Sequence, residues 1–238
     1  MRFVDVRTEL KKRDTFSSIR KEIIACRRCP RLVAFREKIA REKTKRYVDW
    51  EYWGKPVPGF GDTKASLVLV GLAPAPHGGN RTGRVFTGDL SAKFLIDCLY
   101  AAGFANQPIS ESRKDGLKLI DAYMLAAVRC VPPDNIPEKE EFNNCYPFFS
   151  REMRLLTHKK AILALGKIAF DACIRYAREQ GLDTRGMTFR HGAIYRMENF
   201  PLLCASYHPS PRNTNTGTLT RKMFLDMLTK IRKEADIH

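Results

Sequence analysis

The sequence lacks any long apolar run. No stretch of its 238 residues approaches the roughly 20 consecutive apolar residues that a membrane-spanning helix needs. The first ten residues also lack the apolar core of a signal peptide. We therefore expect a cytoplasmic protein with no membrane segment.

Two common nucleotide-binding motifs are missing as well. The chain has no GKS or GKT phosphate-binding loop, and no Gly-x-Gly-x-x-Gly turn that opens directly into a helix. Glycine is instead concentrated between residues 71 and 89, where it allows a ligand to approach the backbone closely. A nucleotide-handling enzyme that uses this segment stays an alternative, which binding of free nucleotide without preference for DNA would favour.

Acidic residues are scarce relative to basic ones. The chain has 42 Lys and Arg against 26 Asp and Glu, a formal net charge of +16, and residues 1–60 contribute +9 of it (17 basic minus 8 acidic). A polyanion is the simplest partner for such a field, so nucleic acid is the first partner to consider. A basic surface that serves only solubility, or a metal-stapled nucleic-acid-binding module without catalysis, would also explain the charge.

The apolar pattern predicts an α/β fold. Four short apolar runs are typical of buried strands, at residues 66–72, 122–131, 161–165 and 202–207. Each precedes a helical pattern, at about 91–102, 138–156, 167–180 and 218–234, and a charged helical region spans 7–47. This alternation predicts a mostly parallel four-stranded sheet covered by helices on both faces. We expect one domain over residues 1–238, with a helical N-terminal segment over about residues 1–60.

Ligands of such sheets bind at the carboxyl ends of the strands, which directs attention to three loops. The first begins at Gly71 and Ala73, which we expect to contact the substrate, and ends at Asp89, either a helix N-cap or a catalytic carboxylate. Within it, Phe86 is either a core aromatic or a stacking platform for a base, and His77 is a candidate for supporting the site from behind.

The other two loops add an amide and a histidine. Asn135 follows a Pro-Pro-Asp turn, so it either serves the turn or reads the edge of a pyrimidine through its amide. His208 ends the fourth strand directly before Pro209, where it is well placed to donate a hydrogen bond to developing negative charge. We expect a polar tip after it to contact DNA, formed by Ser210, Pro211, Arg212 and Asn213.

Seven cysteines form two groups. Cys26 and Cys29 have the C-x2-C spacing of a metal or cluster ligand pair, and a returning loop would bring Cys130 and Cys145 to them. Spacing alone leaves zinc, an iron–sulfur cluster and simple burial of the second pair open. The remaining three lie in apolar runs and are expected in the core: Cys98, Cys173 and Cys204.

Two long motifs resemble one family. GLAPAPHGGNRTGRVFTGD and HPSPRNTNTGTLTR, together with AAVRCVPPDN and the four placed cysteines, resemble the family-five (UDGb-type) uracil-DNA glycosylases over roughly residues 22–230. The resemblance implies a three-layer α/β/α fold and a monomeric, monofunctional glycosylase that removes uracil, and often hypoxanthine or other altered bases, from DNA. It also implies a structural [4Fe–4S] cluster on Cys26, Cys29, Cys130 and Cys145, which makes residues 1–60 a cluster-binding segment.

The resemblance assigns roles to the loop residues. Asp89 matches the catalytic aspartate, Phe86 the stacking aromatic, Asn135 the base-reading amide and His208 the histidine of the last motif. Many other uracil glycosylases carry Asp or Asn directly after the first strand, around Ala75 here, and this chain has neither. The burden of catalysis therefore moves to Asp89, which either orients water or stabilises the sugar cation.

Overall fold

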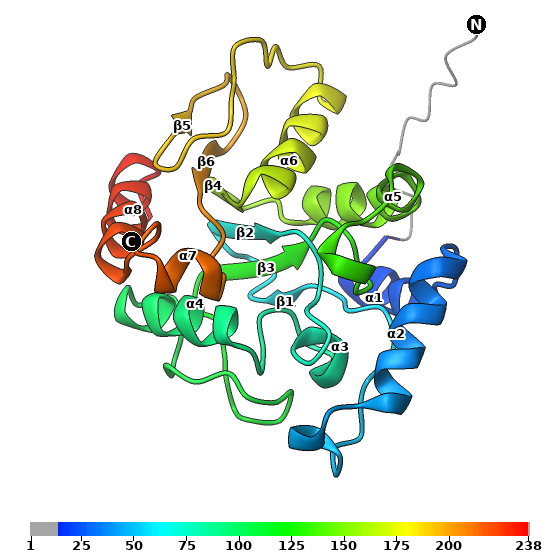
Figure 1. The fold of residues 1–238 in the computed structure, drawn as a ribbon. Coiled ribbons are helices and arrows are strands. Elements are labelled where there is room, and N and C mark those ends of the chain that lie inside the picture. The colour runs from blue at the N-terminus through cyan, green and yellow to red at the C-terminus, as the bar shows by residue number, and fades with distance from the viewer. Residues whose placement is uncertain (1–13, 238) are drawn as a thin grey trace, which may run out of the picture.

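A computed structural model describes residues 14–237, and its centre is one six-stranded sheet between two layers of helices (Figure 1). The strand order is β1-β3-β2-β4-β6-β5. The strands are β1 (Phe60–Gly61), β2 (Leu67–Gly71), β3 (Ala122–Ala126), β4 (Ala161–Leu165), β5 (Ile194–Tyr195) and β6 (Leu202–Ser206). β2, β3, β4 and β6 are mutually parallel, whereas β1 and β5 add antiparallel edges.

The helices cover both faces of the sheet. They are α1 (Phe16–Ala25), α2 (Pro30–Glu42), α3 (Gly79–Thr82), α4 (Leu90–Ala101), α5 (Lys139–Leu155), α6 (Lys167–Glu179), α7 (Pro211–Asn215) and α8 (Arg221–Glu234), with short 3-10 turns at Lys45–Tyr47 and Pro133–Asn135. Alternate residues of each parallel strand point to opposite faces. Leu67 and Leu69 pack with α4 and α8, whereas Val68 and Val70 pack with α5 and α6.

The predicted four-stranded sheet is therefore the parallel centre of a six-stranded one. The two missed strands have two residues each, too short to show a periodic pattern. The predicted strand 122–131 also ends earlier, at Ala126, although the chain stays buried up to Val131. Beyond the strand, the N–H groups of Ala127 and Val128 donate to the carbonyls of Gly71 and Leu72, so this segment continues beside the end of β2.

The charged N-terminal region forms two helices separated by the C-x2-C turn. Thr15 caps α1, whose buried Ile19 and Ile23 pack against Phe148 of α5. Pro30 occupies the first position of α2, where its missing N–H costs nothing. The part of the predicted helical region before residue 14 lies outside the described residues. Across residues 14–237 we find no helix with the length and apolar character to span a membrane.

Candidate active site

A small cavity of about 50 Å³ lies where the first and last predicted loops meet, at the carboxyl ends of β2 and β6. It contains five of the predicted site residues. Its lining consists of Gly71, Ala73, Pro74, Ala75, Val85, Phe86, Asp89, Ser91, Ala126 and His208. The cavity therefore lies at the end of the sheet where strand polarity predicts a ligand site.

Asp89 is both an N-cap and a pocket residue. Its Oδ1 accepts a hydrogen bond from the N–H of Ala92 at 2.9 Å, which starts α4. Its Oδ2 lies against Gly78, where an added Cβ would come within 1.9 Å of that oxygen. Burial raises the pKa of Asp89 above its ordinary value, while N–H groups of α4 and the charge of Arg81 act in the opposite direction. The two interpretations of Asp89 are therefore compatible.

Phe86 forms a wall of the pocket. Its backbone has a φ of 45°, a left-handed conformation that non-glycine residues seldom adopt. The ring lies directly against the backbone of Gly71, since an added Cβ there would be 2.8 Å from Phe86 Cζ. The ring centroid is 6.2 Å from that of His208, with 32° between the planes. The ring packs against the main hydrophobic core and also lines the pocket, so the core and pocket interpretations of Phe86 do not exclude each other.

His208 faces the pocket from the end of β6. The Asn213 side chain donates to the His208 carbonyl oxygen at 2.8 Å, which ties α7 to the end of the strand. No hydrogen bond to the imidazole ring is formed among residues 14–237. Burial lowers the pKa of His208 to about 4. At neutral pH the ring is therefore uncharged and offers one N–H donor to a ligand.

Two buried arginines hold the first loop, and the sequence interpretation missed both. Arg81 is 1% exposed and lies over the rings of Tyr47 and Trp50, at 4.0 and 4.1 Å from the two centroids. It donates to the carbonyls of His77 and Gly88, which bracket the loop. Aromatic residues at 47 and 50 and an arginine inside a glycine-rich loop were the available signal.

The second buried arginine that holds this loop is Arg84. Arg84 donates to the Thr87 hydroxyl at 2.8 Å and forms a buried ion pair with Asp115 at 2.7 Å. Its guanidinium also lies over the ring of Phe60. His77, expected behind the site, is hydrogen-bonded to the Tyr52 hydroxyl at 3.0 Å and does not line the pocket. The loop that carries Phe86 and Asp89 is thus fixed at several points.

The remaining predicted contacts lie outside the pocket. Asn135 is exposed on the 3-10 turn Pro133–Asn135, with a φ of 59°, and does not line the cavity. Ser210 precedes α7, and Pro211, Arg212 and Asn213 form its first turn, with Arg212 exposed. The structure therefore brings Asp89, Phe86 and His208 together and leaves Asn135 apart from them.

All four predicted ligand cysteines line a second cavity. Cys26 and Cys29 flank the turn between α1 and α2, Cys130 follows β3, and Cys145 lies on α5. Within residues 14–237, no three His, Cys, Asp or Glu side chains converge tightly enough to ligate one metal ion. The thiols surround a space instead of meeting at a point. The other three cysteines are buried in the core as expected: Cys98, Cys173 and Cys204.

The surroundings of these thiols are polar in a specific way. Arg36 Nη1 donates to Cys130 Sγ at 2.9 Å, the backbone N–H of Arg129 donates to Cys145 Sγ at 3.5 Å, and Asn144 donates to Cys29 Sγ at 3.6 Å. Burial raises the pKa of Cys130 to about 11 and that of Cys145 to about 12, while Arg36 acts in the opposite direction on Cys130. Burial therefore favours the protonated thiols, and the nearby guanidinium of Arg36 favours the thiolate of Cys130.

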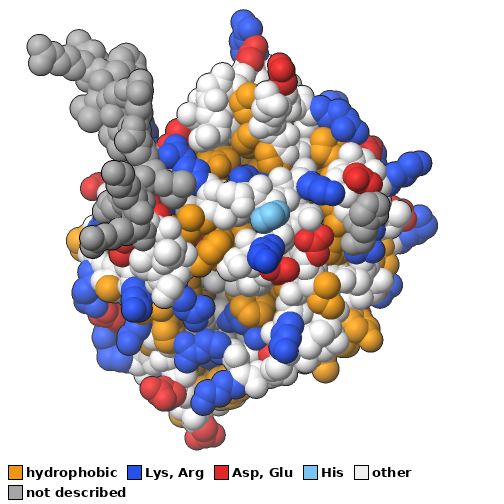
Figure 2. Space-filling view, turned by 180° about the vertical axis from the view of Figure 1, so that it is seen from behind, with side chains coloured by type: hydrophobic (Ala, Val, Ile, Leu, Met, Phe, Trp, Pro, Cys, Tyr) orange, Lys and Arg blue, Asp and Glu red, His pale blue; other side chains and the backbone are white. Residues whose placement is uncertain are grey.

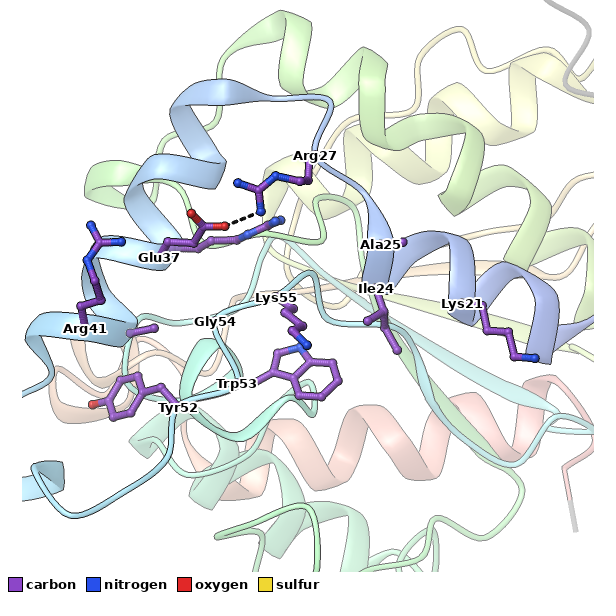
Figure 3. A pocket seen from close by; sticks show the side chains of 12 residues that line it. Lys21, Ile24, Ala25, Arg27, Glu37, Arg41, Tyr52, Trp53, Gly54 and Lys55 are labelled. Atoms are coloured by element: carbon purple, nitrogen blue, oxygen red, sulfur yellow. Dashed lines mark hydrogen bonds and ion pairs between the residues drawn. The ribbon is translucent and has the colours of Figure 1, made fainter.

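A larger groove of about 730 Å³ runs between α1, α2 and the segment from Tyr52 to Lys55 (Figure 3). Five basic side chains line it against one acid, Glu37, which pairs with Arg27 at 2.5 Å. Lys21, Arg41 and Lys55 have no ion-pair partner among residues 14–237. The floor is joined to the first loop, because Trp53 and Gly54 donate backbone hydrogen bonds to the carbonyls of α3.

Comparison with known proteins gives a consistent result. Residues 58–232 match the profile of the uracil DNA glycosylase superfamily. The chain is 45% identical over 215 residues to the type-5 uracil-DNA glycosylase of Thermus thermophilus, which covers 90% of this chain and 96% of that protein. It is 41% identical to the type-5 enzyme of Pyrobaculum aerophilum over 90% of both chains, and 26% identical to the type-4 uracil-DNA glycosylase of Sulfurisphaera tokodaii over 93% and 86%.

Proposed function

The chain belongs to the type-5 uracil-DNA glycosylases of the uracil DNA glycosylase superfamily, and we propose on this basis that it hydrolyses the N-glycosidic bond of uracil in DNA. Such a reaction initiates base excision repair. The observation that carries the proposal is one pocket that contains a carboxylate, an aromatic face and a neutral imidazole, from Asp89, Phe86 and His208.

The reaction separates charge, and the pocket has groups of both kinds. The target base first leaves the helix stack, and the ring of Phe86 offers a surface on which it can stack. When the glycosidic bond breaks, its electron pair stays on the base nitrogen and positive charge develops on the sugar carbon. Asp89 stabilises this cation or orients the attacking water. The neutral His208 donates its N–H to an oxygen of the departing base, where negative charge grows.

Water completes the reaction. Its oxygen forms the new bond to the sugar carbon and one of its protons is released, so that the products are the free base, after protonation, and an abasic site. The N-terminus of α4 favours the ionised form of Asp89 through its backbone N–H groups, which supports a carboxylate that acts as an anion. No covalent intermediate with the protein is needed, in keeping with a monofunctional glycosylase.

We also propose that the enzyme accepts hypoxanthine and other altered bases. The walls near the end of β2 consist of small residues, namely Gly71, Ala73, Ala75 and Ala126. Among the residues that line the pocket there is no Asn or Gln to read the edge of a single base. Small walls give little steric discrimination, so base choice depends on how easily each base leaves the stack. Asn135 contributes to base reading only if its turn moves toward the pocket when DNA binds.

The proposed partner is DNA, held at two places. Ser210, Pro211, Arg212 and Asn213 at the start of α7 are adjacent to His208, which suits contact with the strand that carries the lesion. The basic groove of Figure 3 offers unpaired cations for the phosphate backbone. Figure 2, turned by 180° from Figure 1, shows Lys and Arg gathered at its lower left, which corresponds to the right-hand side of Figure 1, where α2 and the segment after it lie.

The four cysteines that surround one cavity fit a [4Fe–4S] cluster, and we propose that they hold one. A cubic cluster separates its thiolates more widely than a single zinc ion does, and thiolates surrounding a space suit the larger group. The cluster would supply structural cross-linking, joining the α1–α2 turn to α5 and to the loop after β3. No ligand position would be open for chemistry, so catalysis stays with the residues of the first pocket.

The same contacts support a single functional unit. We propose that residues 1–238 form one domain, with about residues 1–60 as its cluster-binding segment, and that it acts as a monomer. The described part of that segment packs on α5 through α1 and holds Arg81 through Tyr47 and Trp50.

Incubation with a uracil-containing oligonucleotide, followed by alkaline strand scission, tests the activity directly. Cleavage at the uracil position, absent from the thymine-containing control, supports the proposal. DNA binding without base release would instead support the alternative, a nucleic-acid-binding module without catalysis in which a metal only stabilises the fold. Single-lesion oligonucleotides with hypoxanthine or oxidised pyrimidines, used in the same assay, test the broader base range.

A further inference from the structure

Two buried arginines line the four-cysteine cavity. Arg36 and Arg129 are 2% and 1% exposed, although arginine is seldom fully buried unless a partner neutralises its charge. They come from different parts of the fold, α2 and the loop after β3. Apolar packing does not explain why two buried cations lie at the same cavity.

Arg36 has no acidic partner there. Its Nη1 donates to Cys130 Sγ at 2.9 Å and its Nη2 to the carbonyl of Cys26 at 3.2 Å, so both contacts involve a ligand residue. Its Nε is buried without a hydrogen-bond partner in the described part of the chain. No ion pair joins Arg36 to a carboxylate of residues 14–237; the neighbouring Glu37, whose pKa the charge of Arg36 lowers less than Arg27 does, pairs with Arg27. The charge of Arg36 is therefore directed toward the sulfurs.

Arg129 is partly neutralised. Its Nη2 lies 2.6 Å from Glu152 Oε2, and Glu152 also accepts a hydrogen bond from the Tyr123 hydroxyl. Its Nε and Nη1 are nevertheless buried with no partner among the described residues. The other buried carboxylate that acts on these thiols, Glu141, is paired with Arg31, so Arg36 and the two pairs together sum to one net positive charge. A preformed cationic shell of this kind is suited to an anionic group.

A ligated iron–sulfur cluster is such a group, because four thiolates carry more negative charge than the core carries positive. Hydrogen bonds to the sulfurs and local charge are two of the factors that set its reduction potential. We propose that Arg36, assisted by Arg129, is the counter-charge of the cluster: it stabilises the reduced, more negative state and slows the loss of iron. This inference rests on the proposed cluster and concerns no catalytic step.

The link from Arg36 to the active site uses its backbone only. The Asn80 side chain of α3 donates to the Arg36 carbonyl at 3.2 Å in a buried contact. Replacing the Arg36 side chain therefore leaves this connection in place. Arg36→Gln removes the charge but keeps a donor, and Arg36→Lys keeps the charge but loses the planar fork. Lys38→Gln, on the exposed side of the same helix, is the matched control.

The test uses the purified full chain, with iron content, absorbance near ~400 nm and reduction potential as readouts. For Arg36→Gln we expect about a tenfold shift of the one-electron equilibrium toward the oxidised form, which corresponds to ~59 mV, and a several-fold faster loss of iron to a chelator. Arg36→Lys should recover much of the potential and Lys38→Gln should match wild type. If Arg36→Gln loses its iron on purification while Arg36→Lys retains it, this result also supports Arg36 as the counter-charge of the cluster.

Arg129 is tested by a double variant. Arg129→Gln alone would leave Glu152 buried and unpaired, so Glu152→Gln accompanies it. We expect a smaller fall in potential than for Arg36→Gln, because a carboxylate leaves with the guanidinium. Equal potentials and equal rates of iron loss in Arg36→Gln, Lys38→Gln and wild type would overturn the inference while leaving the cluster intact. Wild-type protein without iron would overturn the cluster itself, and this inference with it.

Discussion

The ring of Phe86 lies against the backbone of Gly71, so closely that a Cβ at position 71 would be 2.8 Å from Phe86 Cζ. This contact explains why the last residue of β2 has no side chain: the residue that follows the strand's apolar run is covered by the aromatic wall of the pocket. The ring can occupy this position only because residue 71 has no Cβ.

Gly71→Ala should therefore reduce activity by displacing Phe86. A shift of the ring by about 1 Å is expected to lower kcat/KM on the order of 100-fold. Phe86→Leu removes the aromatic face, and Gly71→Ala with Phe86→Leu should be little worse than Phe86→Leu alone, because both act through one ring. Steady-state kinetics of the two single variants and the double variant on a uracil oligonucleotide give the double-mutant cycle. Fully additive losses would show that Gly71 acts through something other than Phe86.

Asp89→Asn separates the cap from the chemistry. Asparagine caps helices as well as aspartate does, so α4 should keep its start while the charge is lost. We expect activity to fall about 100-fold to 10,000-fold. Burial raises the pKa of Asp89, so its ionised form costs stability above that pKa, and the variant should melt at or above the wild-type temperature.

Asp89→Ala, by contrast, should lose both activity and thermal stability, since it also removes the cap. Calorimetry alongside the glycosylase assay distinguishes the two variants. An Asp89→Asn enzyme with wild-type rates would leave Asp89 as a helix cap only.

The pH profile should have one acidic limb and a flat region at neutral pH. We propose that Asp89 acts as an anion; because burial raises its pKa, activity should fall as pH decreases through a value above that of an ordinary aspartate. The pKa of His208 is about 4, so the ring stays neutral between about pH 6 and 8 and adds no inflection there. Single-turnover rates measure the profile. A limb that persists unchanged in Asp89→Asn would assign it to another group.

Removal of one ligand thiol should remove the iron. Cys145→Ala is expected to lose the broad absorbance near ~400 nm and its bound iron, and to melt at a lower temperature because the α1–α2 turn is no longer joined to α5. Cys173→Ala is the matched control, since Cys173 is equally buried but lies in the core. Iron and zinc analysis of both variants decides the matter, and a colourless wild-type protein containing zinc would contradict the cluster.

Charge removal in the groove should weaken DNA binding in a salt-dependent manner. Lys21→Gln with Lys55→Gln removes two unpaired cations that line it, and we expect the slope of log K against log salt to fall by about 0.9 for each phosphate that the variant no longer neutralises. Lys64→Gln with Lys118→Gln is the control, because these exposed lysines precede β2 and β3, at the amino ends of the strands, whereas the groove is joined to the loop that follows β2. Fluorescence anisotropy at several salt concentrations gives the slopes. Equal slopes for both pairs would exclude the groove as a DNA-binding surface.

The strands and helices could be predicted because their signals are local. The four parallel strands are continuous apolar runs, and α4, α5, α6 and α8 begin and end within a few residues of the expected ranges. The pocket was found by a rule about sheets, and the grouping of the cysteines by spacing together with family resemblance. Asp89 is instructive, since the structure shows the N-cap and also places the carboxylate at the pocket, so the cap does not exclude the catalytic role that we propose.

The features that the sequence did not predict depend on contacts between residues that are distant in the chain. The aromatic residues at 47 and 50 and the arginines of the glycine-rich loop are visible in the sequence, but no local pattern pairs Arg81 with the two rings or Arg84 with Asp115. The exposure of Asn135 likewise depends on how the loop after β3 turns, which the Pro-Pro-Asp sequence does not specify. Edge strands of two residues have no pattern of their own.

The position of Arg81 also determines how far the chain can be shortened from its N-terminal side without exposing the base of the first loop. The superfamily match begins at residue 58, but the two rings that cover the Arg81 guanidinium belong to Tyr47 and Trp50. A protein trimmed to the matched region would leave that buried cation uncovered at the base of the loop that carries Asp89. Expression, fusion and domain-transplant designs should therefore place their upstream junction before residue 47, and before Cys26 where the proposed cluster is to be kept.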